Sequence, residues 1–518
     1  MTQLLRKYAT LCAALALAAT ACSAPQGPAT RPDDTFVIGL SSEFDNLSPV
    51  LGFSPDGGSL IFDGLMSRAP DLTIRPALAA GRPVVAEDGR TVTFTLREGL
   101  KFHDGRPLTS QDVEYTYEAL LDPANNSTIR SDYSAIEDVA APDARTVVFT
   151  LKHPYAPLVQ RTTLGIVPKG TLERTRPVGS GPYRFVSWTP GDKIVLEANK
   201  EYWGGAPAIS RLVLAFAPDD NVRATRIRAG DFDATVLPPK AATGLRGQPG
   251  MTVYDVPSAD YRAVMFPMTR PVTGDRAVRK AFGLALDRQA MADTILAGAG
   301  VPAHGPISPD TGWHDPEVTG AATADPAAAG RLLDEAGWKP GEDGIREKDG
   351  KQARFTLMYP AGDSLRKELA LAAASDAKKI GLLVEPAGLD WDAIEARLGE
   401  DAAVMGFGSP YDPDYVNYEL FHSDFKGQGF LNPGRYDNPE VDRLLERGRA
   451  SGEKAERERA YRDFQKIVRD DEVFSYMLFL KHVYVVRGEY EGIVPGVDAH
   501  EHATGGLFAG IHTWKPAA

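Results

Sequence analysis

Residues 97–113 have the sequence REGLKFHDGRPLTSQDV. They follow an alternating apolar and polar segment, residues 91–96, which predicts a half-buried strand. His103-Asp104-Gly105 then predicts a tight turn, because glycine and aspartate favour turn conformations. Thr109 or Ser110 follows as the N-cap of a helix predicted over Ser110–Leu121, with Pro123 beyond its end. The stretch therefore predicts a strand, a turn and a capped helix in direct succession.

The rest of the chain continues this mixture of strands and helices. Thr146–Leu151 alternates as a strand, and residues 278–296 form an amphipathic helical segment. Pro326 opens a helix that Gly337 can cap, since a left-handed glycine commonly ends helices. A helix over residues 365–380 stops at Gly381 and leads at once into a strand, residues 382–385, and a charged helix covers residues 454–469. Helices followed closely by strands indicate an α/β protein.

The N-terminus carries the signs of an export signal. A short basic start precedes an apolar run, residues 8–19, that is shorter than the ~20 residues needed to span a bilayer. The run ends in LAATAC, residues 17–22, which resembles the bacterial lipobox, in which the cysteine is lipidated and becomes the new N-terminus. We expect a signal peptide over residues 1–21, lipidation of Cys22 and a tether over residues 22–34. An ordinary signal peptide that contains cysteines is the alternative.

Composition limits the possible functions. The chain has 518 residues, 43% hydrophobic and 25% charged, which is ordinary for a soluble protein and long enough for more than one core. Residues 1–21 contain Arg6, Lys7 and no acid, so their removal changes the net charge from −13 to −15. That acidity argues against a nucleic-acid partner. With Cys22 lipidated the body has no thiol, which excludes disulfides and cysteine nucleophiles.

Residues 97–113 are similar to the signature of the family 5 extracellular solute-binding proteins, the peptide and nickel receptors of ABC importers. Further blocks resemble the family in the same order along the chain. They are VGSGPY (178–183), ANKEYWG (198–204), VRKAF (278–282) with DR (287–288), and YDNPEVD (436–442). The resemblance covers nearly the whole mature chain.

The resemblance implies an α/β, two-lobed periplasmic-binding-protein fold of type II, in the large cluster with an extra subdomain. Lobe I would comprise residues 35–75, 178–258 and 490–518, with the extra subdomain over residues 76–177. Lobe II would comprise residues 263–485. Two crossover strands near residues 256–266 and 483–490 would form the hinge, and both stretches have extended-strand character. The family closes its lobes over the ligand.

The resemblance also places candidate ligand-binding residues. GFGSPYDP, residues 406–413, aligns with a pocket segment of the family, in which Phe407 and Tyr411 would line the cleft. Peptide receptors carry an aspartate four residues before the last proline, which pairs with the peptide's amino group. This chain has Ser409 there, and a buried ammonium without a charged partner is costly. Asp412 or Asp414 could replace the missing carboxylate.

The same segment also resembles the nickel-binding branch of the family. There His422 would correspond to the histidine that ligates nickel, and imidazole suits that metal. Arg130 and Tyr133 resemble a pair whose arginine holds the carboxylates of the metal chelator, whereas Arg161 lies near a second such arginine without aligning. A hydrogen-bonded His422 and a solvated Arg130 are the alternatives.

Several other residues remain open. Trp391 and Trp313 are either cleft walls or core, and His103 and Asp104 serve the turn. His500 and His502 lie close together, but two histidines without a third ligand are weak grounds for a metal site.

No motif for catalysis has the required spacing, since both the Gly-x-Ser-x-Gly elbow and His-Glu-x-x-His are missing from the sequence. We therefore predict that the protein is not an enzyme and needs no cofactor. It would be a monomeric receptor that captures a short peptide or peptide-like solute and delivers it to ABC permease subunits. A nickel chelate is the alternative ligand, and a secreted lipoprotein hydrolase, an adhesin or a chaperone are the rival classes. The receptor would be held by its lipid outside the cytoplasmic membrane, in the periplasmic space or at the cell surface.

Overall fold

The structure is a computed structural model that describes residues 34–55, 57–320, 323–500 and 504–517. The predicted signal peptide, Cys22 and almost all of the predicted tether lie outside the described residues, as does His502. Residues 36–518 form one compact unit, which contains every element below except the first residue of β1.

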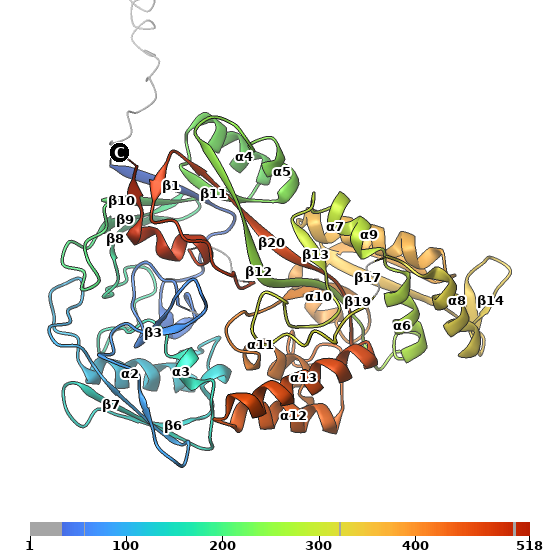
Figure 1. The fold of residues 1–518 in the computed structure, drawn as a ribbon, viewed down its shortest axis with the longest axis horizontal. Helices are drawn as coiled ribbons and strands as arrows, with labels where there is room; N and C mark the ends of the chain where they lie inside the picture. Colours follow the sequence, from blue (N-terminus) through green and yellow to red (C-terminus); the bar gives the residue numbers. More distant parts are fainter. Residues whose placement is uncertain (1–33, 56, 321–322, 501–503, 518) are drawn as a thin grey trace, which may run out of the picture. The chain divides into compact units, whose positions relative to one another are not determined.

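One large mixed sheet organises this unit (Figure 1). Its strands lie in the order β18-β17-β19-β12-β20-β11-β1-β10-β9-β8, with β13 paired to β20. In that order their bounds are Leu383–Leu389, Arg354–Pro360, Ala402–Phe407, Met251–Met265, Phe474–Arg487, Ala234–Leu237, Thr35–Leu40, Arg211–Phe216, Lys193–Ala198 and Tyr183–Thr189, and β13 is Gly300–Pro302. Because parallel β1 and β11 lie on one side of the β12–β20 pair and parallel β17, β18 and β19 lie on the other, the sheet has two α/β halves.

Two long strands join the halves. Antiparallel β12 and β20 pair over nearly their full length, with Met251 opposite Arg487 and Met265 opposite Phe474. The ladder shifts register between Pro257 and Tyr261, in the middle of β12. Figure 1 shows both strands running from one half of the unit to the other. A register shift in a pair of long strands is a natural place for the chain to bend.

Most buried side chains belong to cores that lie on one side of this shift, whereas a smaller core of residues 37–245, 483 and 485 also includes Ala299. One core draws on residues 36–256 and 484–514, which we call the first lobe. Two further cores draw on residues 261–480, which we call the second lobe. The finer boundaries expected from the sequence, including those of the extra subdomain, stay predictions.

Helices cover the sheet and confirm most of the sequence-based assignments. Their bounds are α2 (Ser110–Leu121), α3 (Leu158–Arg161), α4 (Asp220–Ala229), α5 (Pro239–Thr243), α6 (Arg276–Ala285), α7 (Arg288–Thr294), α8 (Pro326–Glu335), α9 (Ser364–Lys378), α10 (Trp391–Arg397), α11 (Asp414–Phe421), α12 (Pro439–Ala450) and α13 (Lys454–Asp471). One expectation was wrong: residues 278–296 are two helices, α6 and α7. Leu286 has an extended backbone, which ends α6. The side chain of Asp287 accepts a hydrogen bond from the Ala290 N–H and is the N-cap of the second helix, α7.

A smaller sheet lies in the first lobe beside α2. Its order is β4-β5-β7-β6, with bounds Val84–Val85, Thr91–Thr95, Thr146–Leu151 and Ile136–Ala140. Asp112 in the first turn of α2 accepts hydrogen bonds from the N–H and hydroxyl of Thr109, at 2.8 and 3.0 Å. The stretch 97–113 therefore folds as its sequence predicts.

His103 connects two of the sequence blocks. Its N–H donates to the Gly179 carbonyl at 2.8 Å, its Nδ1 accepts from the Gly179 N–H at 3.3 Å, and its Nε2 lies 3.0 Å from the Gly181 carbonyl. Burial lowers the pKa of His103 to about 4, so the ring is neutral at pH 7. His103 thus serves the turn and also fixes the Gly-rich segment against it.

We expect Gly179→Ala to lower the free energy of unfolding by about 1–3 kcal/mol, as overpacking usually does. A Cβ at Gly179 would lie 2.0 Å from the Ile61 carbonyl oxygen, which is backbone and cannot turn aside. Urea denaturation would measure the loss. Gly81→Ala is the matched control, because a Cβ there meets nothing within 4 Å. Equal stabilities of the two variants would contradict this packing argument.

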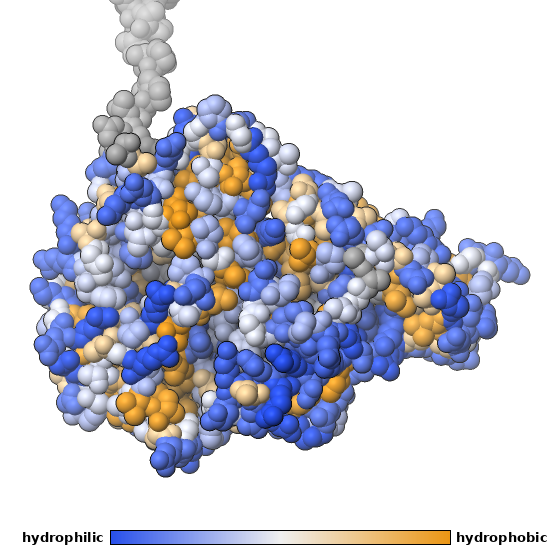
Figure 2. All heavy atoms as spheres, viewed as in Figure 1, coloured by the Kyte–Doolittle hydropathy of each residue, from blue (hydrophilic) through white to orange (hydrophobic). Residues whose placement is uncertain are grey.

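The surface is polar over the C-terminal helices. Figure 2 shows mainly hydrophilic residues where α12 and α13 lie in the same view. Within the described part of the chain, no helix combines the length and apolar character that a membrane span requires.

Candidate ligand-binding cavity

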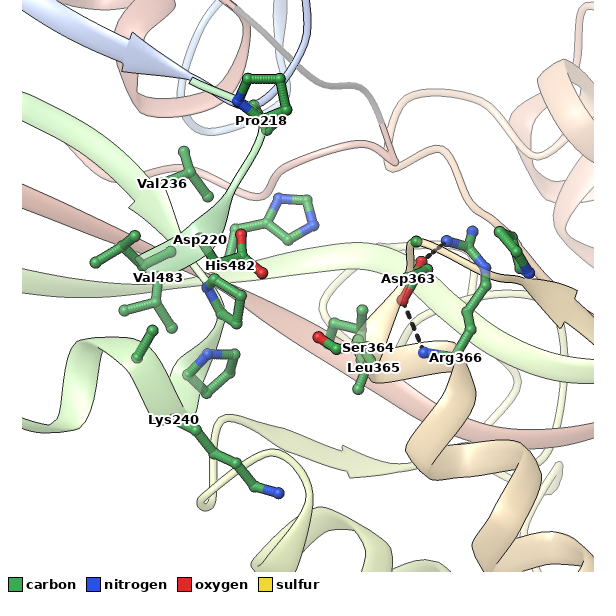
Figure 3. Close-up of a pocket in the computed structure, with 18 of the residues that line it drawn as sticks. Pro218, Asp220, Val236, Lys240, Asp363, Ser364, Leu365, Arg366, His482 and Val483 are labelled. Atoms are coloured by element: carbon green, nitrogen blue, oxygen red, sulfur yellow. Dashed lines mark hydrogen bonds and ion pairs between the residues drawn. The ribbon is translucent and has the colours of Figure 1, made fainter. Parts of the chain in front are cut away.

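A cavity of about 1230 Å³ lies between the lobes, against the joining strands (Figure 3). The carboxyl ends of β1 and β11 reach it from the first lobe, and those of β17 and β18 reach it from the second. Strands β12 and β20 contribute Asp260, Arg262, His482 and Tyr484. Open α/β sheets bind ligands at the carboxyl ends of their parallel strands, so this is the expected place for a site.

The wall formed by the joining strands is a network of charges. Asp260 and Arg262 are two residues apart on β12, so they share one face, and Arg262 donates to the Asp260 carboxylate. His482 on β20 lies 3.3 Å from Asp260 and 3.1 Å from Asp498, and His500 Nδ1 lies 2.7 Å from Asp260. The network therefore ties both joining strands to the segment that begins at Asp498.

Electrostatics fix the charge states in this network. Burial alone would raise the pKa of Asp260, but Arg262 and the histidines outweigh it and hold that pKa well below its usual range. Burial likewise opposes a charge on His482, yet its bonds to Asp260 and Asp498 raise the pKa of His482 to about 9. Burial lowers the pKa of His500 against the pull of Asp260. At pH 7 His482 is therefore charged.

The second lobe contributes the N-terminal ends of two helices. Asp363 caps α9 by accepting from the Arg366 N–H at 2.8 Å, and it also pairs with the Arg366 guanidinium. Asp390 caps α10 through the Ala393 N–H at 2.8 Å. Trp391, the first residue of α10, is 42% exposed and lies beside Arg366, whose Cζ is 5.5 Å from a ring centroid. Trp391 therefore lines the cavity, whereas Trp313 packs on Tyr461 in the second lobe.

The first lobe contributes α4, α5 and the ends of β1 and β11. Asp220 pairs with the buried Arg223, which also donates to the carbonyls of Ala217 and Pro218. Lys240 on α5 forms an ion pair of 2.5 Å with Glu368 on α9. That pair crosses from one lobe to the other at the wall of the cavity.

The lobes also touch away from this cavity. Arg68, on strand β2 (Met66–Arg68), donates to the Tyr415 hydroxyl at 2.8 Å and stacks 3.6 Å above the ring of Tyr411. The Tyr155 hydroxyl donates to Asp414 at 3.1 Å. The structure therefore shows the two lobes in contact.

The predicted ligand-binding residues lie elsewhere, since the residues that line the cavity include none of them. Phe407 packs against Phe474 and Tyr261 in the second-lobe core. Tyr411 lies at the contact between the lobes, beneath Arg68. As ligand contacts both stay predictions.

The two candidate replacements for the missing carboxylate are buried and paired within the protein. Asp412 accepts two hydrogen bonds from Arg457, at 2.9 and 2.7 Å. Asp414 accepts from Arg449 at 3.1 and 3.0 Å as well as from Tyr155. Both carboxylates already have cationic partners, and as anchors for an ammonium group both stay predictions.

The residues of the nickel alternative have different surroundings, and as metal or chelator contacts they stay predictions. Arg130 is exposed, whereas Tyr133 is buried and donates to the Arg161 carbonyl at 3.0 Å. His422 is 3% exposed, accepts from the Asp424 N–H through Nδ1, and places Nε2 3.4 Å from Glu446. Among the described side chains, no group of three His, Cys, Asp or Glu residues could hold a metal ion.

Arg161 has a different place from the one considered in the sequence. It is buried, pairs with Asp132 at 3.1 Å, donates to the Tyr155 hydroxyl and lies 4.0 Å from the centroid of the Tyr415 ring. It therefore supports the contact between the lobes.

Sequence reasoning missed most of the cavity. Asp260 and Arg262 are charged residues at alternate positions of the mostly apolar stretch 259–266, which is a signal that could have marked them. Arg366 is a cation in the first turn of a helix, where the helix dipole disfavours it. Such irregularities are clues to function, but they do not show which distant residues come together.

The fold and the cavity together define the class of protein. Two α/β lobes joined by two long strands, with a cavity between them, form a two-lobed binding protein. Residues 73–428 match the bacterial extracellular solute-binding proteins, family 5, and the chain belongs to this family.

Similar proteins cover nearly the whole chain. Protein XP55 of Streptomyces lividans is 48% identical over 493 residues, which are 93% of this chain and 90% of the relative. The structure of NikZ from Campylobacter jejuni with Ni(L-His) has a TM-score of 0.84 at 27% identity, covering 93% of this chain and all of that one. AppA from Bacillus subtilis with a nonapeptide has a TM-score of 0.80 at 25% identity, covering 93% and 99%.

These similarities confirm the predicted family and the two-lobed periplasmic-binding-protein fold. The protein is a substrate-binding protein of the ABC importer class, and its family consists of extracellular solute-binding proteins rather than enzymes.

Proposed function

We propose that the protein captures a short peptide or peptide-like solute in the cavity between its lobes. The observation that carries this proposal is the cavity itself, at about 1230 Å³. Sites for drug-sized ligands usually measure ~300–1,000 Å³, so this one has room for a ligand of several residues. The nonapeptide bound by the Bacillus subtilis relative supports the same ligand class.

Capture would proceed by closure about β12 and β20. Contacts between the lobes, such as Lys240–Glu368 and Tyr155–Asp414, form only when the lobes approach. A ligand that touches both lobes adds to these contacts and shifts the equilibrium toward the closed state. The closed protein is then the form that a permease would recognise.

We further propose that Cys22 carries the lipid that holds the receptor outside the cytoplasmic membrane. The LAATAC stretch supports this assignment. The receptor would act as a monomer and pass its solute to ABC permease subunits without a cofactor of its own.

Native mass spectrometry of the form that begins at Ser23, purified without refolding, tests the ligand class. We expect a bound mass that fragments into amino acids, because a ligand enclosed between closed lobes can leave only after they open. Thermal unfolding with added peptide should then show the stabilisation that binding to the folded state produces. Release of a chemically altered product would instead favour a hydrolase.

A nickel isotope pattern with a small chelator would overturn the peptide assignment. Ni(L-His), the ligand of the Campylobacter relative, is the probe for this outcome. If His422 is the ligating residue, His422→Ala should abolish binding of that chelate. Unchanged chelate binding by this variant would remove His422 from the site.

A further inference from the structure

Two arginines lie together at the wall of the cavity. Arg262 belongs to β12 and Arg366 to the first turn of α9, and they are only 5% and 8% exposed. Both converge on Gly406 of β19. A Cβ on that glycine would lie 2.5 Å from Arg262 Nη1 and 2.8 Å from Arg366 Nη2. The two guanidinium groups are therefore neighbours, and the missing side chain at Gly406 makes room for them.

The described residues use only part of the hydrogen-bonding capacity of Arg262 and Arg366. A guanidinium group has five N–H donors. Arg262 donates from Nη1 to Asp260 and to the Tyr261 carbonyl, and Arg366 donates from Nη1 to Asp363. The Nε atoms of both are buried and have no acceptor among the described residues. Buried donors are normally satisfied, so two such groups side by side require an explanation.

The charged groups around Arg262 and Arg366 affect how readily an anion would bind there. Burial and then the charge of Arg262 lower the pKa of Arg366, and Asp363 and Asp260 only partly offset this shift. Protonated His482 adds positive charge on the far side of Asp260. Each arginine already pairs with one carboxylate, so an added anion would bind through the donors that these pairs leave unused.

The carboxylates of the cavity are already engaged. Five acidic residues line it, and four of them are ion-paired with protein cations. The fifth, Asp390, caps α10. The carboxylates are thus committed, whereas the two arginines keep unused donors, which suits a negatively charged ligand group better than an ammonium group.

We propose that Arg262 and Arg366 bind a carboxylate of the solute, and that the site does not require a free amino group. The proposal rests on the peptide function proposed above and names the part of the ligand that is recognised. Arginine forks match carboxylates in bidentate geometry.

An apolar body would lie beside the carboxylate. Trp391, Leu365, Leu389 and Pro238 line the cavity near or opposite the arginines. Figure 3 shows Leu365 close to Asp363 and Arg366, and Lys240 and Val236 on the other side. The preferred solute is therefore a peptide with an apolar C-terminal residue and a free carboxylate, whether or not its amino group is blocked.

Three pools of di- to tetrapeptides test this proposal: unmodified, N-acetylated and C-amidated. Each is offered to the form that begins at Ser23, and capture is read by native mass spectrometry. We expect the first two pools to be captured and the amidated pool to be captured at least tenfold less. Capture of amidated but not of acetylated peptides would overturn the carboxylate proposal while the peptide function stands. Capture from none of the pools would overturn the peptide function, and this proposal with it.

Variants connect the preference to the two arginines. Arg366→Gln should weaken binding of a captured peptide at least tenfold, measured by calorimetry, and should remove the preference for the acid over the amide. Lys367→Gln, the same charge change at the exposed neighbouring position, should change affinity less than twofold. Arg262→Gln provides a second variant, and thermal unfolding without peptide shows that each protein is folded. Unchanged affinity in the folded arginine variants would also overturn the proposal.

Discussion

Replacing Asp412 with alanine should lower the free energy of unfolding by about 3–5 kcal/mol, as expected when one partner of a buried ion pair is removed. Asp412 is 2% exposed and receives two hydrogen bonds from Arg457. Burial disfavours the Arg457 cation, but Asp412 outweighs burial and raises the pKa of Arg457. The variant would leave this charge buried without its partner.

The same substitution decides between two roles for Asp412. If it anchored the amino group of a peptide, Asp412→Ala would weaken binding and leave stability nearly unchanged. The structure predicts the reverse, with stability lost and the peptide affinity of the folded fraction retained. Urea denaturation and calorimetry on one preparation measure both quantities. Asp463→Ala, at an exposed position of the helix that carries Arg457, should stay within about 0.5 kcal/mol of the parent protein.

The stability that His482 contributes should depend on pH. Its pKa is raised from 6.5 to about 9 in the folded protein, because hydrogen bonds and charges from Asp260 and Asp498 outweigh burial. Because folding raises this pKa, the charged ring stabilises the folded state. The stabilisation is complete below pH 6.5 and disappears as the pH rises through 9. The shift corresponds to about 3 kcal/mol across that window.

His482→Gln isolates this contribution. The difference in unfolding free energy between the parent and the variant should shrink by about 3 kcal/mol from pH 6.5 to 9.5, measured by urea denaturation at each pH. Lysines and tyrosines that titrate in this range do so in both proteins and cancel. His153→Gln, at an exposed position, should show no such change. A difference that is constant with pH would mean that folding does not raise the pKa of His482.

The consequence extends to function, because His482 lies on a joining strand. It connects β12 to β20 and to the segment at Asp498, and Tyr484 donates to the same Asp498 carboxylate. Above pH 9 the ring loses its charge, so the hinge region and the cavity wall lose one positive group together.

The stretches that were predicted well are those whose structure is determined by residues close in sequence. Helix α2 begins at Ser110 and ends at Leu121 as expected, because the cap, the apolar face and the terminating proline are all local. The family blocks are local as well, and they identified the family and the two-lobed fold. The one wrong helix, over residues 278–296, failed because Asp287 was not recognised as a second cap.

The binding residues were harder to predict, because contacts between distant segments depend on topology. Asp412 and Asp414 were candidates for ligand binding because they lie in or beside a stretch that resembles a family pocket segment. Arg457 and Arg449, 45 and 35 positions away, already pair with them.

The sequence by itself determined the fold class, the family and most local elements, since backbone propensity, capping and motif order act over a few residues. Only the tertiary structure decided which charged groups share the cavity. Asp260 and His482 are 222 positions apart, and Arg262 and Arg366 come from a joining strand and a second-lobe helix. Their proximity follows from the pairing of β12 with β20 and from the placing of α9 beside β19. No local pattern contains that information, because the interactions that create it exist only once the chain has folded.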